Sequence, residues 1–121
     1  MSSSAVILFA HGARESEWAR PFEEVLNRLR SQGARAELAF LEIMTPSLEE
    51  AARMLAAEGH TTVTVVPLFL AQGGHVKRDL PGKVAAIARK HPGTEFRVTP
   101  ALGDAPEIVA AIAAWVKRAV G

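Results

Sequence analysis

Two continuous runs of apolar residues constrain the fold of this chain most strongly. They are AVILFA, residues 5–10, and TVTVVPLF, residues 62–69, and both are rich in β-branched side chains. Runs of this length and composition are typical of strands buried on both faces of a parallel sheet. Residues 34–41 and 95–100 alternate polar with apolar side chains, which predicts less completely covered strands at the edges of the sheet.

Four segments with helical spacing alternate with these strands. The first carries an apolar stripe between residues 18 and 29. The second is predicted to begin with Thr45 as its N-cap. The third is expected to run from about Asp79 to His91, and the fourth to open at Asp104 with a capping-box pair.

Strands and helices that alternate with short connections predict an α/β fold: a single-lobe, open, parallel four-stranded sheet with helices on both faces. With right-handed crossovers and the two continuous strands in the centre, the strand order is 2-1-3-4. The chain has 121 residues, and residues 1–121 are interpreted as one domain. In such a sheet a ligand binds beyond the carboxyl ends of the strands, where the strand order reverses.

Three residues of metal-ligand type follow strand ends. His11 leaves the first strand, Glu42 ends the second, and His75 is expected in the loop beyond the third. Because these strands are predicted neighbours, the three side chains are expected to form a divalent-metal site with open coordination positions. Simpler alternatives stay open: a loop or capping role for either histidine, and a solvated strand end for Glu42.

Cations and glycines cluster near the two histidines. Arg14, Lys77 and Arg78 predict a ligand with several negative charges. Gly73 and Gly74 would let the backbone approach that ligand closely. The sequence contains neither GxGxxG nor GxxxxGK[ST], so a nucleotide phosphate is not indicated.

Composition excludes several classes of protein. The absence of cysteine excludes disulfides, thiolate catalysis and cysteine-ligated zinc. A formal net charge of +1 argues against a nucleic-acid partner. No apolar run approaches the roughly 20 residues that span a bilayer, so no membrane partner is expected. The first residues lack the features of a signal peptide, and a cytoplasmic location is expected.

The motifs AHGAR and PLFLAQGGHVKRDLP, with the FLE that closes the second strand, resemble the short CbiX-type sirohydrochlorin chelatases over nearly the whole chain. The resemblance implies ATP-independent insertion of a divalent metal into sirohydrochlorin. The metal, usually cobalt and in some members nickel or iron, is a substrate, and no permanently bound cofactor is implied. By position, the metal-binding and catalytic residues of the family fall on His11, His75 and Glu42. The carboxylates of the substrate would account for the nearby cations.

The resemblance also bears on assembly. Longer members of the family contain two such lobes that face each other across a cleft, so a single lobe implies a homodimer. Two other functions stay open: a non-catalytic module that carries metal or tetrapyrrole, and a small hydrolase with His11 as its base. The hydrolase lacks a plausible set of nucleophile, base and orienting residue.

Overall fold

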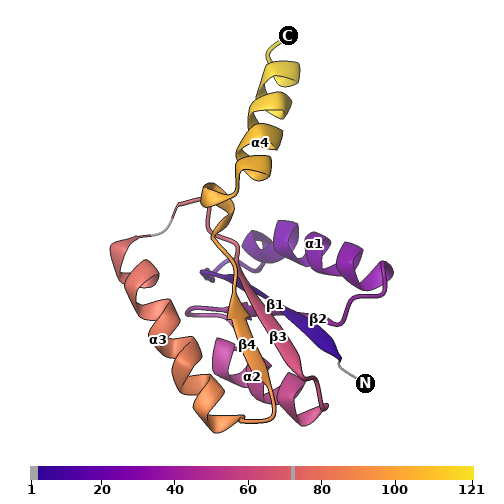
Figure 1. The fold of residues 1–121 in the computed structure, drawn as a ribbon. Helices are drawn as coiled ribbons and strands as arrows, with labels where there is room; N and C mark the ends of the chain where they lie inside the picture. Colours follow the sequence, from indigo (N-terminus) through magenta and orange to yellow (C-terminus); the bar gives the residue numbers. More distant parts are fainter. Residues whose placement is uncertain (1–2, 72) are drawn as a thin grey trace.

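The computed structural model describes residues 3–71 and 73–121. Within these residues the strands form one parallel sheet in the order β2-β1-β3-β4 (Figure 1). The strands are β1 (Ser4–Ala10), β2 (Ala36–Phe40), β3 (Thr62–Pro67) and β4 (Glu95–Val98). Strand β1 pairs on both sides, so that Leu8 lies opposite Leu38 of β2 and Val66 of β3. The predicted fold class and strand order are confirmed.

Helices cover both faces of the sheet, as predicted. The helical elements are η1 (Ser16–Ala19), α1 (Arg20–Ser31), α2 (Leu48–Ala57), α3 (Gly74–Lys90), η2 (Leu102–Asp104) and α4 (Pro106–Ala119). Helix α1 packs on one face, and α2 and α3 pack on the other. Among the described helices, none combines the length and the apolar character needed to cross a bilayer.

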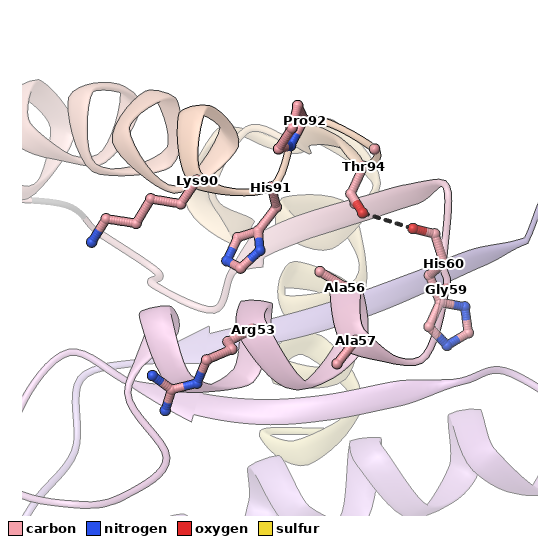
Figure 2. Close-up of a pocket in the computed structure, with 10 residues that line it drawn as sticks. Arg53, Ala56, Ala57, Gly59, His60, Lys90, His91, Pro92 and Thr94 are labelled. Carbon is pink, nitrogen blue, oxygen red and sulfur yellow. Dashed lines mark hydrogen bonds between the residues drawn. The ribbon is translucent and has the colours of Figure 1, made fainter.

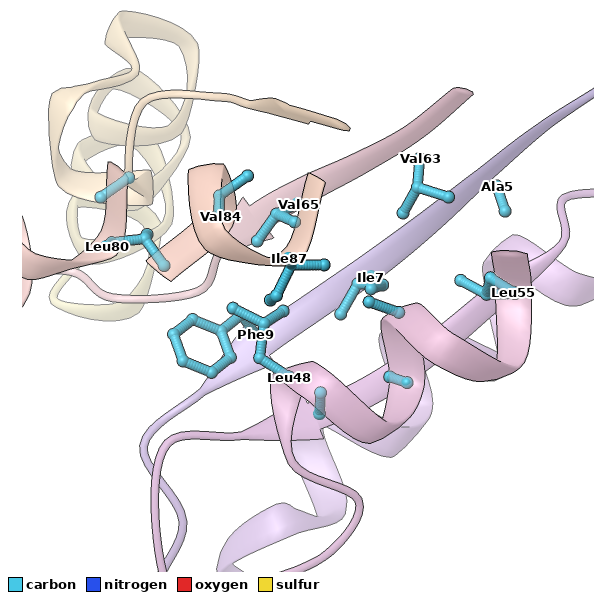
Figure 3. Packing of buried hydrophobic residues seen from close by; sticks show 14 of the residues in the cluster. Ala5, Ile7, Phe9, Leu48, Leu55, Val63, Val65, Leu80, Val84 and Ile87 are labelled. Carbon is cyan, nitrogen blue, oxygen red and sulfur yellow. The ribbon is translucent and has the colours of Figure 1, made fainter. Parts of the chain in front are cut away.

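The larger part of the hydrophobic core lies between the sheet and helices α2 and α3. Figure 3 shows Ile7 and Phe9 of β1 packed with Val65 of β3 and with Leu48 and Ile87 from the two helices. A second cluster lies on the opposite face, where α1 covers β1 and β2. The alternation of side chains along each strand divides the apolar residues between these two clusters.

The cover over the strands differs from the prediction. Strand β3 is buried on one face only: Val63 and Val65 are fully buried. Their neighbours Thr62, Thr64 and Val66 face the side of α1 and are only half-buried. Strand β2 is more buried than predicted because α1 packs across it, whereas β4 is the exposed edge that was expected. The second face of β3 is open because α1 does not extend over it.

Helix α3 begins earlier than predicted. It starts at Gly74, with Gly73 as N-cap, rather than near Asp79. His75 therefore lies in the first turn of a helix and not in a loop. Pro81 lies inside the helix. Because proline removes one backbone hydrogen bond from a helix interior, its position favours a helix that begins just before Pro81. The turn of α3 before Pro81 is also helical, and in this turn Val76 packs against the buried core.

The N-cap of α2 is Ser47 and not the predicted Thr45. The amide of Glu50 donates to Ser47 Oγ at 3.1 Å, and the amide of Ser47 donates to Glu50 Oε1 at 2.8 Å, which forms a capping box. Thr45 and Pro46 are joined by a cis peptide bond, and the Pro46 carbonyl accepts from the amide of Phe40. These residues belong to the loop, so the helix begins after the serine.

Helix α4 extends away from the rest of the molecule (Figure 1). Its N-cap is Ala105, without a side-chain hydrogen bond, and Asp104 lies in η2, so the predicted capping box is wrong. None of the 14 residues of α4, all of which are described, is buried. The predicted apolar face exists, but Ile112 and Trp115 are 41% and 64% exposed and do not cover the sheet.

A polar network holds the amino end of the sheet. The guanidinium of Arg35 donates to both carboxylate oxygens of Glu58 at 2.9 and 2.7 Å. Glu58 Oε1 lies 3.0 Å from His60 Nε2, and His60 Nδ1 is bonded to Ser3 Oγ. The hydrogen bonds from Arg35 and then from His60 lower the pKa of Glu58 to about 2. The network joins the end of α2 to the starts of three strands.

We expect Glu58→Gln to lower the urea midpoint of unfolding at pH 7. The pKa of Glu58 is lowered from 4.5 to about 2, so its contribution to stability is fully present above pH 4.5 and is lost as the pH falls through about 2. The difference between variant and wild type should therefore shrink between these pH values. Glu24→Gln, which removes an exposed ion pair with Arg28, is the control and should have little effect. An equal difference at pH 7 and pH 3 would contradict the assignment.

Candidate functional site

The loops at the carboxyl ends of β1 and β2 are held side by side by backbone hydrogen bonds. The amide of Leu41 donates to the carbonyl of Ala10 at 2.8 Å, and the amide of Glu42 donates to the carbonyl of His11 at 3.0 Å. The parallel pairing of β1 and β2 thus continues past the ends of both strands. It places two of the predicted site residues directly beside each other.

The imidazole of His11 is positioned by the hydrophobic core. Its ring centroid lies 4.4 Å from that of Phe69, and Phe69 packs edge to face against Phe9 at 5.7 Å. Both phenylalanines are buried, whereas His11 is half-buried. A ring supported in this way loses little conformational freedom when it binds a ligand.

A hollow of about 330 Å³ brings Glu42 and His75 together. Glu42 reaches it from the loop after β2, and His75 from the first turn of α3. The remaining lining residues are Phe9, Leu41, Val76, Asp79, Leu80 and Lys83. His11 does not line this hollow but contacts Phe69, the neighbour of Phe9. The structure therefore joins two of the three predicted ligands in one hollow and places the third close by.

Within residues 3–71 and 73–121, no three His, Cys, Asp or Glu side chains lie close enough to hold a metal ion together. Joint metal binding by His11, Glu42 and His75 therefore stays a prediction. Imidazole and carboxylate are nevertheless ligands that suit divalent cobalt, nickel and iron.

Two further residues of the hollow were missed by the sequence analysis. Asp79 and Lys83 follow His75 at intervals of four residues, so that all three lie on one face of α3. The spacing is visible in the sequence. It was overlooked because the helix was expected to start at Asp79, which placed His75 outside it.

The predicted cations do not all face the same hollow. Arg14 and Arg78 are exposed beside the two histidines, but Lys77 lines a separate hollow of about 180 Å³ together with Asp104. In the described part of the chain, the ion pairs include none of these three cations. Their charges are available to a ligand, and their role in binding it stays a prediction.

The predicted glycines lie at the start of α3. Gly73 is the N-cap, and a Cβ atom there would meet nothing within 4 Å; the nearest atoms to one at Gly74 belong to the Arg78 guanidinium. The first turn is therefore open to solvent. The partial positive charge of a helix N-terminus would favour carboxylate groups of a ligand here.

The loop after β2 is tightly constrained beside the hollow. Ile43 has a positive φ of 70°, a conformation that is rare and costly for a β-branched residue. Gly12 has a φ of 98°, and a Cβ atom there would lie 1.9 Å from the Glu42 carbonyl oxygen. Such constraints are found mainly at functional sites, where the surrounding structure holds a defined geometry.

A larger hollow lies elsewhere, at the amino ends of β3 and β4. It has a volume of about 440 Å³, and Figure 2 shows Arg53, Lys90 and His91 around it. His60 also lines it, and its carbonyl accepts from Thr94 Oγ1 at 2.9 Å. Ligands of open α/β sheets bind at the opposite, carboxyl end, so this hollow is a weaker candidate despite its size.

The fold and the site together define a class: a doubly wound α/β protein whose imidazole and carboxylate groups gather where the strand order reverses. The sequence model of the CbiX family matches residues 5–119. The chain therefore belongs to the CbiX family.

Individual relatives agree with this assignment. The chain is 40% identical over 82 residues to a sirohydrochlorin cobaltochelatase of Sulfurisphaera tokodaii, an alignment that covers 68% of each protein. It resembles the crystal structure of a CbiX protein from Marinobacter aquaeolei VT8 with a TM-score of 0.85, 31% identity and 97% of both chains covered. The sirohydrochlorin chelatase SirB of Bacillus subtilis subspecies spizizenii, solved with cobalt, gives a TM-score of 0.79 at 25% identity, covering 96% of this chain and 50% of SirB.

The clash at Gly12 generates a prediction about stability. Gly12→Ala should destabilise the fold by clearly more than Gly33→Ala. Both residues have positive φ, but only at Gly12 would the added Cβ atom clash with another atom, the Glu42 carbonyl oxygen. The backbone strain alone is worth about 1–2 kcal/mol. The comparison is the free energy of unfolding of the two variants in urea. Equal losses would show that the loop moves freely and that the Glu42 carbonyl is not fixed against Gly12.

Proposed function

We propose that this protein inserts cobalt into sirohydrochlorin as an ATP-independent chelatase, with the metal as a substrate. Membership of the CbiX family supports the reaction, and the relatives named as sirohydrochlorin chelatases support the substrate. The observation that carries the proposal is the shared hollow of Glu42 and His75, with His11 beside it at the carboxyl edge of the sheet.

The residues match the chemical needs of metal insertion. The metal must arrive with open coordination positions, and two pyrrole protons must leave the ring. In our proposal, the imidazoles of His11 and His75 bind the ion weakly enough to release it, and either can accept a pyrrole proton. Glu42 compensates the charge of the ion or receives a proton. This assignment leaves the chain without a need for a nucleotide.

The surroundings suit a flat apolar ring with carboxylates at its rim. Ile43 and Leu70 follow β2 and β3 at this edge and expose 62% and 61% of their surface. Arg14, Arg78 and Lys83 supply positive charge at the same edge. Cations bind carboxylates through charge-assisted hydrogen bonds, while exposed apolar side chains contact the faces of the ring.

Cobalt is the proposed metal because the Sulfurisphaera tokodaii relative, whose alignment covers 68% of each protein, is named as a cobaltochelatase. The ligand types also accept nickel and iron. Initial insertion rates with the three metals, measured under identical anaerobic conditions, test the choice. A faster rate with iron or nickel than with cobalt would overturn it.

We also infer that the working form is a homodimer. One lobe offers a single wall to the substrate, whereas ligand pockets bury about 70–90% of a small ligand's surface. The chain aligns with 50% of SirB, which is consistent with a second lobe on the other side of a cleft. A second copy related by two-fold symmetry would supply that wall.

We expect His11→Ala and His75→Ala each to reduce the rate of cobalt insertion by about 100-fold or more, a loss in the range found when a proton-transfer group is removed. Glu42→Gln should cause a smaller loss. Absorption spectra of sirohydrochlorin mixed with cobalt report the rate. The control is His91→Ala, which changes a histidine at the opposite end of the sheet and should leave the rate unchanged. Wild-type rates in a folded His11/His75 double variant would refute the proposed site.

The same measurement separates an enzyme from a binding module. Insertion faster than the protein-free rate at catalytic protein concentrations supports the enzyme. A spectral change that stops when the amount of altered sirohydrochlorin equals the amount of protein supports a carrier of metal or tetrapyrrole.

Lys83→Glu should raise the KM for sirohydrochlorin more than it lowers kcat. Contacts to carboxylates remote from the pyrrole nitrogens contribute similarly to ground-state and transition-state binding. Added salt should weaken the effect, because exposed charges are screened within about 8 Å at physiological ionic strength. Lys90→Glu, at the other end of α3, is the matched control. A defect in kcat alone that does not respond to salt would argue against substrate contact.

A further inference from the structure

A polar stripe on α3 carries His75, Asp79 and Lys83 at intervals of four residues. Each member immediately precedes a residue of the same helix that packs in the core, namely Val76, Leu80 and Val84. Successive residues of a helix are rotated by about 100°, so the polar stripe runs along the border of the buried face. There it lines the hollow that Glu42 reaches from the opposite side.

This hollow offers His75 two side-chain acceptors for a hydrogen bond. The ammonium group of Lys83 only donates, and the other lining residues are apolar: Phe9, Leu41, Val76 and Leu80. Among the lining side chains, an N–H group of the His75 imidazole can therefore be accepted by Glu42 or by Asp79.

The two carboxylates are held by different parts of the fold. Glu42 lies on the loop after β2, where its amide donates to the carbonyl of His11 at 3.0 Å. Asp79 lies on the same helix as His75, one turn further along. Residues four apart on a helix have Cβ atoms about 5–6 Å apart, and the later side chain leans toward the earlier turn. The helix itself therefore brings Asp79 to His75, whatever the conformation of the loops.

His75 needs such support more than His11 does. The ring of His11 stacks on Phe69 at a centroid distance of 4.4 Å, which limits its orientations. His75 is exposed in the first turn of α3, and the aromatic contacts found in residues 3–71 and 73–121 do not include it. An exposed ring without such packing loses more conformational freedom when it binds a ligand.

A purely structural role for Asp79 has little support. Lys83 lies one turn beyond it, but exposed pairs at this spacing contribute little to stability. Among the ion pairs of the described residues, none involves Asp79, Lys83 or His75. Over the same residues no three His, Cys, Asp or Glu side chains are close enough to hold an ion together. A supporting role therefore suits Asp79 better than a place among the metal ligands.

We propose that Asp79 is a positioning residue for His75. Its carboxylate accepts the N–H of one ring nitrogen, so that the other nitrogen presents its lone pair to the metal ion. A hydrogen bond of this kind fixes the tautomer and the ring orientation of a metal-binding histidine. Glu42 then stays free to face the ion. The inference deepens the proposed function and rests on it, because it assumes that His75 binds the metal.

The test measures the affinity of the protein for cobalt alone, without sirohydrochlorin, by calorimetric titration. Asp79→Ala should weaken cobalt binding by about 10–100-fold, the range found when the supporting partner of a metal ligand is removed. Asp79→Asn keeps a side-chain oxygen and should lose less. Asp104→Ala removes a carboxylate from the neighbouring hollow of Lys77 and is the matched control, with unchanged affinity expected. Urea unfolding of each variant shows that it is folded.

A double-mutant cycle with His75→Ala separates positioning from other effects. If Asp79 acts through His75, Asp79→Ala should cause almost no further loss of cobalt affinity in the His75→Ala background. Equal losses in both backgrounds would overturn the proposal, because Asp79 would then act on the ion without His75.

Moving the carboxylate provides a second check. The double variant Asp79→Ala/Lys83→Asp returns a negative charge to the hollow, but two turns away from His75 and beyond its hydrogen-bonding reach. Its cobalt affinity should stay as low as that of Asp79→Ala. Recovery of the wild-type affinity would show that only the charge of the hollow matters, and positioning would be refuted.

The same titrations distinguish failure of this inference from failure of the proposed function. Weak binding by His75→Ala together with wild-type binding by Asp79→Ala would refute the positioning role and leave the metal site standing. Wild-type binding by His75→Ala would remove His75 from the metal site, and the role of Asp79 with it.

Discussion

The structure depends above all on β1, which pairs with β2 on one side and β3 on the other. Because all these pairings are parallel, the carboxyl ends of the three strands meet at one edge. The hydrogen bonds from Leu41 and Glu42 to Ala10 and His11 extend the pairing into the loops. One side of the candidate site is therefore joined by backbone hydrogen bonds to the end of a buried strand.

The two ends of the sheet differ in a way that fits a division between stability and function. At the amino end, Arg35, Glu58 and His60 satisfy one another, and α2 and α3 end nearby. At the carboxyl end, Ile43 holds a strained conformation, and several cations have no ion-pair partner among the described residues. Backbone strain costs stability, and it persists where a ligand or a fixed geometry makes use of it.

The two faces of the sheet also differ, and the difference follows from the order of the strands. A right-handed connection from β1 to β2 places α1 on one face, and connections that run in the other direction place α2 and α3 on the other. Helix α4 is the element that would balance the layers, yet it leaves the domain. The apolar stripe of α4 is therefore left exposed in the single chain.

Much of the architecture could be predicted because it is encoded locally. The apolar runs at residues 5–10 and 62–69 mark central strands, and the alternation of strands and helices leads to the order 2-1-3-4 through the handedness of crossovers. The positions of His11 and Glu42 at neighbouring strand ends follow from that order. Local residue types predicted the helices. The predicted N-cap of α2 and the predicted start of α3 were wrong, because several residues near Ser47 and Gly74 could begin a helix.

Tertiary structure alone decided which side chains share a surface. His75 faces Glu42 together with Asp79 and Lys83 because packing of Val76 and Leu80 keeps α3 helical ahead of Pro81. Lys77, on the same helix, faces a different hollow because residues two apart on a helix point in different directions. The apolar stripe of α4 was evident from its residues, but its exposure was not. The amphipathic pattern fixes which face of a helix avoids water, whereas the contacts at Ala101 and Gly103 set the direction in which the helix leaves the sheet.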